Sequence, residues 1–146
     1  MPYLLDTNHC IYLINGASKP IHKRSVHEEN SLKAIQLLPE PLHISRITLA
    51  ELYYGVFKSE RVKQNLETLR VFKRSVKILS ITEHLLKRFG ELKADLRKQG
   101  KVIENFDLMI GCTAILHDHT LVTNDQVFDM LQPTLKTVNW SAGATP

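Results

Sequence analysis

The sequence predicts an α/β domain with a mostly parallel sheet and helices on both faces. Short apolar runs alternate along the chain with longer segments of helical period, which is the pattern of parallel strands joined by helical crossovers. The chain has 146 residues, about the length of one domain. Its hydrophobic content of 43% and charged content of 23% are those of ordinary folded proteins. We expect one domain over residues 1–140 and a frayed tail at residues 141–146.

Five short apolar runs predict the strands, because each is bounded by polar turn residues. The expected strands are residues 3–5, 42–45, 76–80, 121–123 and 137–140. The first run leads into Asp6, Thr7 and Asn8, the pattern of a strand that ends in a helix cap. The last run is expected at an edge of the sheet.

The segments between the strands predict helices. Thr48 with Glu51, and Ser80 with Glu83, form capping-box patterns that open two of them. Gly100 is a natural stop for the second. The expected helices after the first one cover residues 48–57, 60–75, about 81–99, 106–116 and 126–131. The helix at 106–116 is apolar on nearly every side and should be central and buried, whereas the polar stretch 17–30 is interpreted as a loop leading into a helix.

The two cysteines, Cys10 and Cys112, lie far apart and form no C-x-x-C pattern. This excludes a disulfide scaffold and a cysteine zinc site, and favours a reducing cytoplasm. Asp6 interrupts the N-terminal apolar run before a signal peptide could form. No run approaches the ~20 apolar residues of a membrane span. We expect a cytoplasmic protein without a membrane association.

The charge balance leans toward a polyanionic partner. Lysine plus arginine total 19 and aspartate plus glutamate total 15, which leaves a formal charge of +4. Several cations between the first strand and the fourth helix are candidates for phosphate contacts, although a charged helix face is more often only solvated. These are Lys19, Lys23, Arg24, Arg46, Lys58, Arg61 and Lys63.

Four acids occupy positions that this architecture would turn toward one end of the sheet, two of them directly after strands and two near the starts of helices. They are Asp6, Glu51, Asp107 and Asp125. In parallel sheets, ligands bind beyond the carboxyl ends of the strands. Each acid taken alone could simply start a helix. Burying several like charges together is costly without a cation, and carboxylates suit Mg²⁺ or Mn²⁺.

Several blocks of this sequence together resemble a PIN-domain ribonuclease, most closely the VapC toxins of bacterial toxin–antitoxin pairs. The blocks are Leu4-Leu5-Asp6-Thr7-Asn8, Ile44 to Gly55 (ISRITLAELYYG), Phe106-Asp107-Leu108-Met109-Ile110, Leu121-Val122-Thr123-Asn124-Asp125 and Asn139-Trp140. The resemblance implies a single PIN domain over residues 1–140, a sheet ordered 3-2-1-4-5 and a metal-dependent endoribonuclease. It also implies three partners: an RNA substrate, an antitoxin whose tail covers the acidic site, and a second copy of the chain.

The resemblance assigns roles to the acids and to their polar neighbours. Asp6 and Asp107 would be the main metal ligands, with Glu51 and Asp125 holding metal-bound waters or a second ion. Asn124 or Asp129 could share the task of Asp125. The candidate supporting residues that would hydrogen-bond around the metal site are Thr7, Asn8, Ser45 and Thr123.

Two departures and three alternatives accompany this interpretation. The chain has Gly111-Cys112 where the family often has two alanines, and residues 17–38 match no known motif. A phosphatase with Asp6 as nucleophile is disfavoured because Asn8 replaces its second acid. A non-catalytic RNA- or protein-binding module would not need all four acids. The run from His117 to His119 is more simply interpreted as a helix end than as a metal site.

Overall fold

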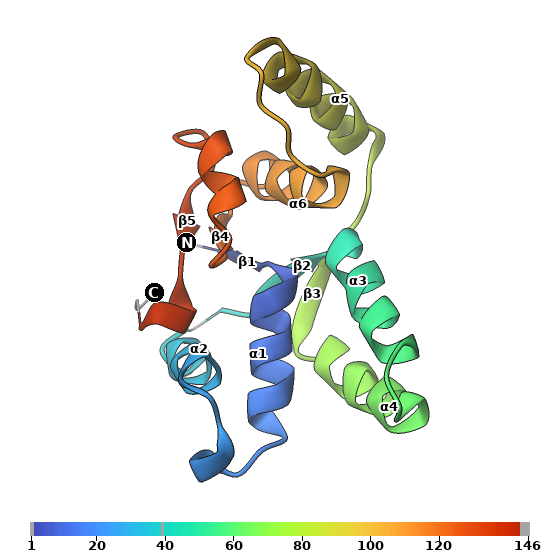
Figure 1. Cartoon of the computed structure of the whole chain (residues 1–146), viewed down its shortest axis with the longest axis vertical. Coiled ribbons are helices and arrows are strands. Elements are labelled where there is room, and N and C mark those ends of the chain that lie inside the picture. The colour runs from blue at the N-terminus through green and yellow to red at the C-terminus, as the bar shows by residue number, and fades with distance from the viewer. Residues whose placement is uncertain (1, 39, 144–146) are drawn as a thin grey trace.

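A central parallel sheet lies between two groups of helices in the computed structural model, which describes residues 2–38 and 40–143 (Figure 1). The strands pair in the order β3-β2-β1-β4-β5, and all four pairings are parallel. Their bounds are β1 (Tyr3–Leu5), β2 (Leu42–Ser45), β3 (Val76–Leu79), β4 (Thr120–Val122) and β5 (Thr137–Val138). The predicted fold class and strand order are confirmed.

Helices cover both faces of the sheet (Figure 1). One group consists of α1 (Thr7–Ala17), α2 (Val26–Gln36), α3 (Arg46–Phe57) and α4 (Val62–Lys73). The other consists of α5 (Glu83–Lys98), α6 (Asn105–Leu116) and the 3-10 helix η2 (Gln126–Leu131). Two more 3-10 helices are η1 (Ile21–Lys23) and η3 (Trp140–Ala142). None of the helices in the described parts of the chain combines the length and apolar character that a membrane crossing requires.

Each face of the sheet has its own hydrophobic core. Successive strand residues point to opposite faces, so Leu4 and Leu121 join the core under α5 and α6. Their neighbours Leu5 and Val122 join the core under the four N-terminal helices. All seven residues from Leu108 to Ala114 are buried, which confirms the prediction of a central, enclosed helix.

Two helices have other N-cap residues than the sequence predicts. The N-cap of α3 is Ser45, whose hydroxyl accepts from the Thr48 amide at 3.0 Å. Ser45 is also the last residue of β2 and keeps extended dihedral angles, so the helix follows the strand without a loop. The N-cap of α5 is Thr82 rather than Ser80, since β3 ends at Leu79 and the helix begins only at Glu83. Glu51 is therefore free of any capping role.

The polar stretch 17–30 contains more helix than expected. Ser25 and Glu28 form a capping box, with the Glu28 amide donating to the Ser25 hydroxyl at 3.1 Å and the Ser25 amide donating to the Glu28 carboxylate at 2.8 Å. Helix α2 therefore begins at Val26, and the loop before it is short.

The expected fraying from residue 141 is wrong for residues 141–143. Trp140 is fully buried with its ring 5.2 Å from that of Tyr3, and Ser141 is buried beside it. The Ser141 carbonyl accepts from the Asn30 amide group at 3.0 Å, which ties η3 to α2. These contacts order the segment because they bury an indole and satisfy the backbone. Residues 144–146 lie outside the described part of the chain.

Candidate active site

The structure brings all four predicted acids together at the carboxyl end of the sheet. Asp6 follows β1, Asp125 follows β4, Glu51 lies on α3, and Asp107 lies in the first turn of α6. They border a hollow of about 210 Å³, named here the acidic hollow. Its lining residues are Asp6, Thr7, Asn8, Glu51, Asp107, Ile110, Asp125 and Phe128. The predicted clustering is thus observed, while the role of each acid as a metal ligand stays a prediction.

Asp6 is held by the helix that it starts. One carboxylate oxygen, Oδ1, accepts from the His9 amide at 2.8 Å and lies 3.0 Å from His9 Nδ1. Both side chains are buried, and that of His9 is fully enclosed. These contacts fix the carboxylate and leave its second oxygen for another partner. Sequence reasoning missed His9, although its position three residues after Asp6 places it on the same turn.

Glu51 is oriented by Thr7, one of the predicted supporting residues. The Thr7 hydroxyl donates to Glu51 Oε1 at 2.6 Å, and a longer 3.4 Å contact joins it to the hydroxyl of Thr48. Thr48 is buried and in turn lies 3.4 Å from the Ser45 hydroxyl. Thr7 therefore touches the site directly, whereas Ser45 reaches it only through two other side chains.

Asp125 repeats the arrangement of Asp6 on the neighbouring strand. Its Oδ1 accepts from the Val127 amide at 2.9 Å and so caps η2. Its own amide donates to the Thr123 hydroxyl at 3.0 Å, which shapes the turn after β4. Asn124 instead donates to the Tyr12 hydroxyl at 2.8 Å and does not line the acidic hollow.

The two remaining predicted residues behave differently. Asn8 is exposed and lines the acidic hollow, so its amide can face a ligand there. Asp129 is exposed on η2 and lies outside the hollow. Asp125 is therefore the acid after β4 that the structure brings to the site.

The four carboxylates are close enough to repel one another. Burial, followed in order of size by the negative charges of Asp125, Glu51, Glu104 and Asp6, raises the pKa of Asp107 to about 6. A carboxyl with this pKa is still mostly ionised at neutral pH. The hollow thus concentrates negative charge that no basic side chain in its lining neutralises.

The donor chemistry of the hollow fits a hard divalent cation. Asp6 and Asp125 each keep one carboxylate oxygen that no backbone amide occupies, and cysteine and histidine are absent from the lining. Within residues 2–38 and 40–143, no three His, Cys, Asp or Glu side chains are close enough to form a complete ligand set. Carboxylates repel one another when no cation lies between them, so these side chains would have to draw closer together to bind an ion.

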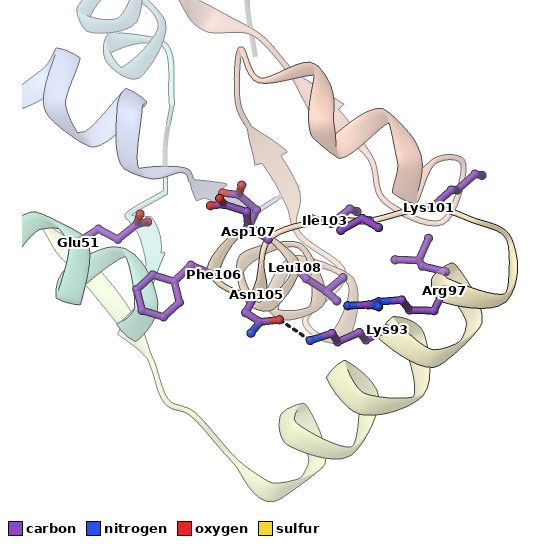
Figure 2. A pocket seen from close by; sticks show the side chains of 12 residues that line it. Glu51, Lys93, Arg97, Lys101, Ile103, Asn105, Phe106, Asp107 and Leu108 are labelled. Atoms are coloured by element: carbon purple, nitrogen blue, oxygen red, sulfur yellow. Dashed lines mark hydrogen bonds between the residues drawn. The ribbon is translucent and has the colours of Figure 1, made fainter.

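A larger hollow of about 490 Å³ adjoins the acidic hollow, and Glu51 and Asp107 line both. We name it the flanking groove. Its other wall comes from the end of α5 and the segment that leads into α6, and three cations line it (Figure 2). They are Lys93, Arg97 and Lys101.

The sequence prediction did not include these three cations, although the four-residue spacing of Lys93 and Arg97 along α5 was a usable signal. None of the seven cations that it proposed lines the flanking groove. Two of those seven are bound between α1 and α2 instead. Lys19 pairs with Glu28 at 2.9 Å, and Arg24 pairs with Glu29 at 3.3 Å.

A third hollow, of about 280 Å³, reaches Glu51 from the other side. It lies between α1, α3 and α4, and its wall is largely apolar. We name it the apolar hollow; its apolar lining residues are Ile11, Ile14, Leu52, Val56 and Leu69. Glu51 therefore borders all three hollows.

The sequence pattern of the PIN domain family matches residues 3–132 of this chain. This chain belongs to the PIN domain family. Ribonuclease VapC2 of Rickettsia felis is 36% identical over 142 residues, which cover 96% of this chain and 98% of the relative. The tRNA(fMet)-specific endonuclease VapC of Shigella flexneri is 31% identical over 141 residues, or 97% and 99% of the two chains.

Solved structures of this PIN branch share the whole fold. VapBC2 from Rickettsia felis, solved bound to a DNA fragment from its promoter, has a TM-score of 0.81 at 36% identity, covering 96% of this chain and 99% of the other. VapBC-1 from nontypeable Haemophilus influenzae has a TM-score of 0.78 at 31% identity, covering 97% and 99%. The chain is thus a PIN-domain nuclease of the VapC type, which confirms the predicted family and excludes the phosphatase alternative.

Proposed function

We propose that the chain is the toxin of a type II toxin–antitoxin pair, an endoribonuclease that hydrolyses RNA phosphodiester bonds with Mg²⁺ or Mn²⁺ in the acidic hollow. The observation that carries this proposal is the meeting of four acids from four elements around Asp107, whose pKa is raised to about 6. Such repulsion is tolerated where a bound cation relieves it. The names of the relatives support RNA as the substrate.

The side chains divide the work of holding the site. Asp6 and Asp107 act as the main ligands, and Glu51 and Asp125 hold metal-bound waters or a second ion. His9 and the first turn of α1 fix the carboxylate of Asp6. Thr7 fixes Glu51, and the Thr123 hydroxyl fixes the turn that carries Asp125. When bound, the cation supplies an activated water and stabilises charge on the leaving oxygen.

Cleavage of labelled RNA tests the proposal. Wild type should cut the RNA with Mg²⁺ and stop with EDTA, and Asp6→Ala should lose the activity. The control is Asp95→Asn, which removes an exposed acid outside the acidic hollow and the flanking groove and should keep wild-type activity. Undiminished cleavage by Asp6→Ala would refute the assignment, and RNA binding without cleavage by any form would support a non-catalytic module.

The same proposal includes a cognate antitoxin in the cytoplasm. The solved relatives include VapBC toxin–antitoxin complexes. The apolar hollow ends at Glu51, so an antitoxin segment with apolar side chains lying there would reach the acidic hollow and cover it. Ile11 is 39% exposed at the rim of the apolar hollow, so Ile11→Glu can be made without opening the core.

Copurification with the coexpressed antitoxin checks this part. Ile11→Glu should lose the antitoxin while the purified nuclease still cuts RNA. The control is Val71→Glu on α4, which is 53% exposed and does not line the apolar hollow. Equal retention of the antitoxin by both variants would place its segment elsewhere.

A homodimer is the remaining part of the proposal. Tyr54 and Phe57 on α3 are 68% and 62% exposed, so they belong to the surface and not to the core. Large exposed aromatic side chains are typical of protein interfaces. Sedimentation of wild type and of Tyr54→Ser/Phe57→Ser tests the assembly: a dimer that becomes a monomer supports it, and a wild-type monomer contradicts it.

A further inference from the structure

The flanking groove is continuous with the acidic hollow but differs from it in charge. Figure 2 shows Lys93 and Arg97 extending across the groove toward Asn105 and Leu108, with Lys101 at its far end. The groove therefore leads from a negative centre to a wall that carries three cations and one acid, Glu104. This spatial order of charges suits a phosphodiester chain, because one phosphate would lie at the cation site while the following phosphates need basic partners.

The cations of the groove are not consumed by internal ion pairs. Lys93 donates to the neutral Asn105 amide oxygen at 2.8 Å, which aims its ammonium group along the groove. Over residues 2–38 and 40–143, no carboxylate pairs with Lys93, Arg97 or Lys101. Their charges are thus available to a ligand.

Phe106 adds an aromatic surface at the junction of the two hollows. It precedes Asp107 on α6, is 50% exposed, and lies between Glu51 and Asn105 in Figure 2. Leaving half of a phenyl ring in water is unfavourable for the free protein. Such a ring beside a basic groove is a stacking platform for an unpaired base.

We propose that the flanking groove binds the unpaired RNA segment on one side of the cleaved bond. Lys93 and Arg97 contact its phosphates, Lys101 contacts the phosphate farthest from the cut, and Phe106 stacks the base next to the cut. This inference rests on the proposed ribonuclease function. It deepens that function, because it makes the substrate single-stranded on that side and makes its length there matter.

Charge neutralisation on one helix tests the phosphate contacts. The variant is Lys93→Gln/Arg97→Gln, and the matched control is Lys87→Gln/Lys98→Gln, which removes the same charge from exposed positions of α5 outside the groove. We expect the groove variant to raise KM by roughly tenfold and to lower the salt slope of RNA binding by about 0.7 for each lost phosphate contact. Its kcat and melting temperature should match those of the control.

Two substitutions of Phe106 test the stacking. Phe106→Leu keeps an apolar side chain and removes the aromatic face, whereas Phe106→Tyr keeps that face. KM should rise about tenfold for the leucine variant and stay within about twofold of wild type for the tyrosine variant. Equal KM values for the two variants would overturn the stacking contact, because both then act only as apolar surface.

Substrate truncation locates the segment. Oligonucleotides are shortened from either side of the cleaved bond and compared on wild type and the groove variant. Truncation of one flank should raise KM for wild type and leave KM of the groove variant unchanged, since the contacts are already lost. Identical responses of the groove variant and the lysine control would overturn the inference, and a groove variant that loses only antitoxin would assign the groove to the protein partner.

The two proposals fail in different ways. If Asp6→Ala is inactive and the groove variant is indistinguishable from its control, the ribonuclease assignment stands and the groove inference falls. If wild type cuts no RNA, the ribonuclease assignment falls. Fluorescence anisotropy of a labelled unpaired oligonucleotide then tests RNA binding by the flanking groove independently of cleavage. Weaker binding by the groove variant than by its control supports the contact, and equal binding overturns it.

Discussion

Ionisable side chains gather at both ends of the sheet. At the carboxyl end, four acids line the acidic hollow. At the opposite end lie three histidines: His43 on β2, and His117 and His119 just before β4. The ring centroids of His43 and His119 are 4.6 Å apart, and those of His117 and His119 are 5.7 Å apart. Both clusters combine partial burial with like groups, so the same physics acts on each.

The clusters differ in how they escape repulsion. Burial lowers the pKa of His43, and His119, Lys77 and His117 lower it further, so the imidazole is neutral at pH 7. Burial and His119 also lower the pKa of His117. Histidines can lose a proton to relieve the cluster, whereas Asp107, with a pKa of about 6, remains mostly charged at pH 7. A cluster of acids that stays charged at pH 7 is therefore a better indication of a cation site than a cluster of neutral histidines.

The largest expected effect comes from breaking the acidic end. Asp107→Asn keeps the shape of the side chain and removes the charge at the centre of the cluster, so we expect a loss of RNA cleavage of at least about a thousandfold. Labelled-RNA assays with Mg²⁺ measure it. A loss of less than tenfold would mean that Asp107 is not a main ligand.

The pH dependence of folding sharpens the comparison. The pKa of Asp107 is raised from 3.8 to about 6, so its carboxyl binds more protons in the folded than in the unfolded chain. The contribution of this carboxyl to the stability of the folded state is therefore present at low pH and is lost as the pH rises through 6. In EDTA, Asp107→Asn should be more stable than wild type above pH 6 and equal to it near pH 4, as measured by urea unfolding. Excess Mg²⁺ at pH 7.5 should stabilise wild type alone.

The histidine end should respond with the opposite sign. The pKa of His43 is lowered on folding, so the unfolded chain binds more protons, and the stability contribution present above pH 6.5 is lost as the pH falls. We compare His43→Gln with its parent in an Asp107→Asn background, which removes the opposing trend of the acid. Between pH 7 and pH 5, the free energy of unfolding should fall less for the His43→Gln variant than for its parent. An unchanged slope would show that His43 does not titrate differently in the two states.

A smaller effect is expected from the hydroxyl that orients Glu51. Thr7→Val keeps the shape and removes the 2.6 Å hydrogen bond, so kcat should fall by roughly three- to tenfold. Thr7→Ser retains the donor and should restore most of the activity. Equal rates for the valine and serine variants would show that the bond does not position Glu51.

The strand order was predicted from the resemblance to PIN-domain ribonucleases and not from the apolar runs alone. Asp6 and Asp125 were predictable because each follows an apolar run whose end the parallel sheet fixes, whereas Glu51 and Asp107 were predicted from their places near helix starts. The residues at which the helices begin were less predictable. Ser45 and Thr48 are both good caps, and the choice depends on where the extended backbone of β2 ends. His9 was missed because burial is invisible in one sequence. Lys93 and Arg97 were missed because their place beside Asp107 depends on how α5 packs against α6.

Asp6 and Asp125 each give one carboxylate oxygen to the backbone amide of the helical segment that follows. The chemistry and the local fold therefore share the same side chains. A change that removes the whole carboxylate removes a helix cap as well as a proposed ligand of the cation, while the amide analogue keeps a capping oxygen and loses only the charge. An inactive lineage that drifts at these positions would lose part of its folded structure together with its activity, which is a reason for such acids to outlast the reaction they serve.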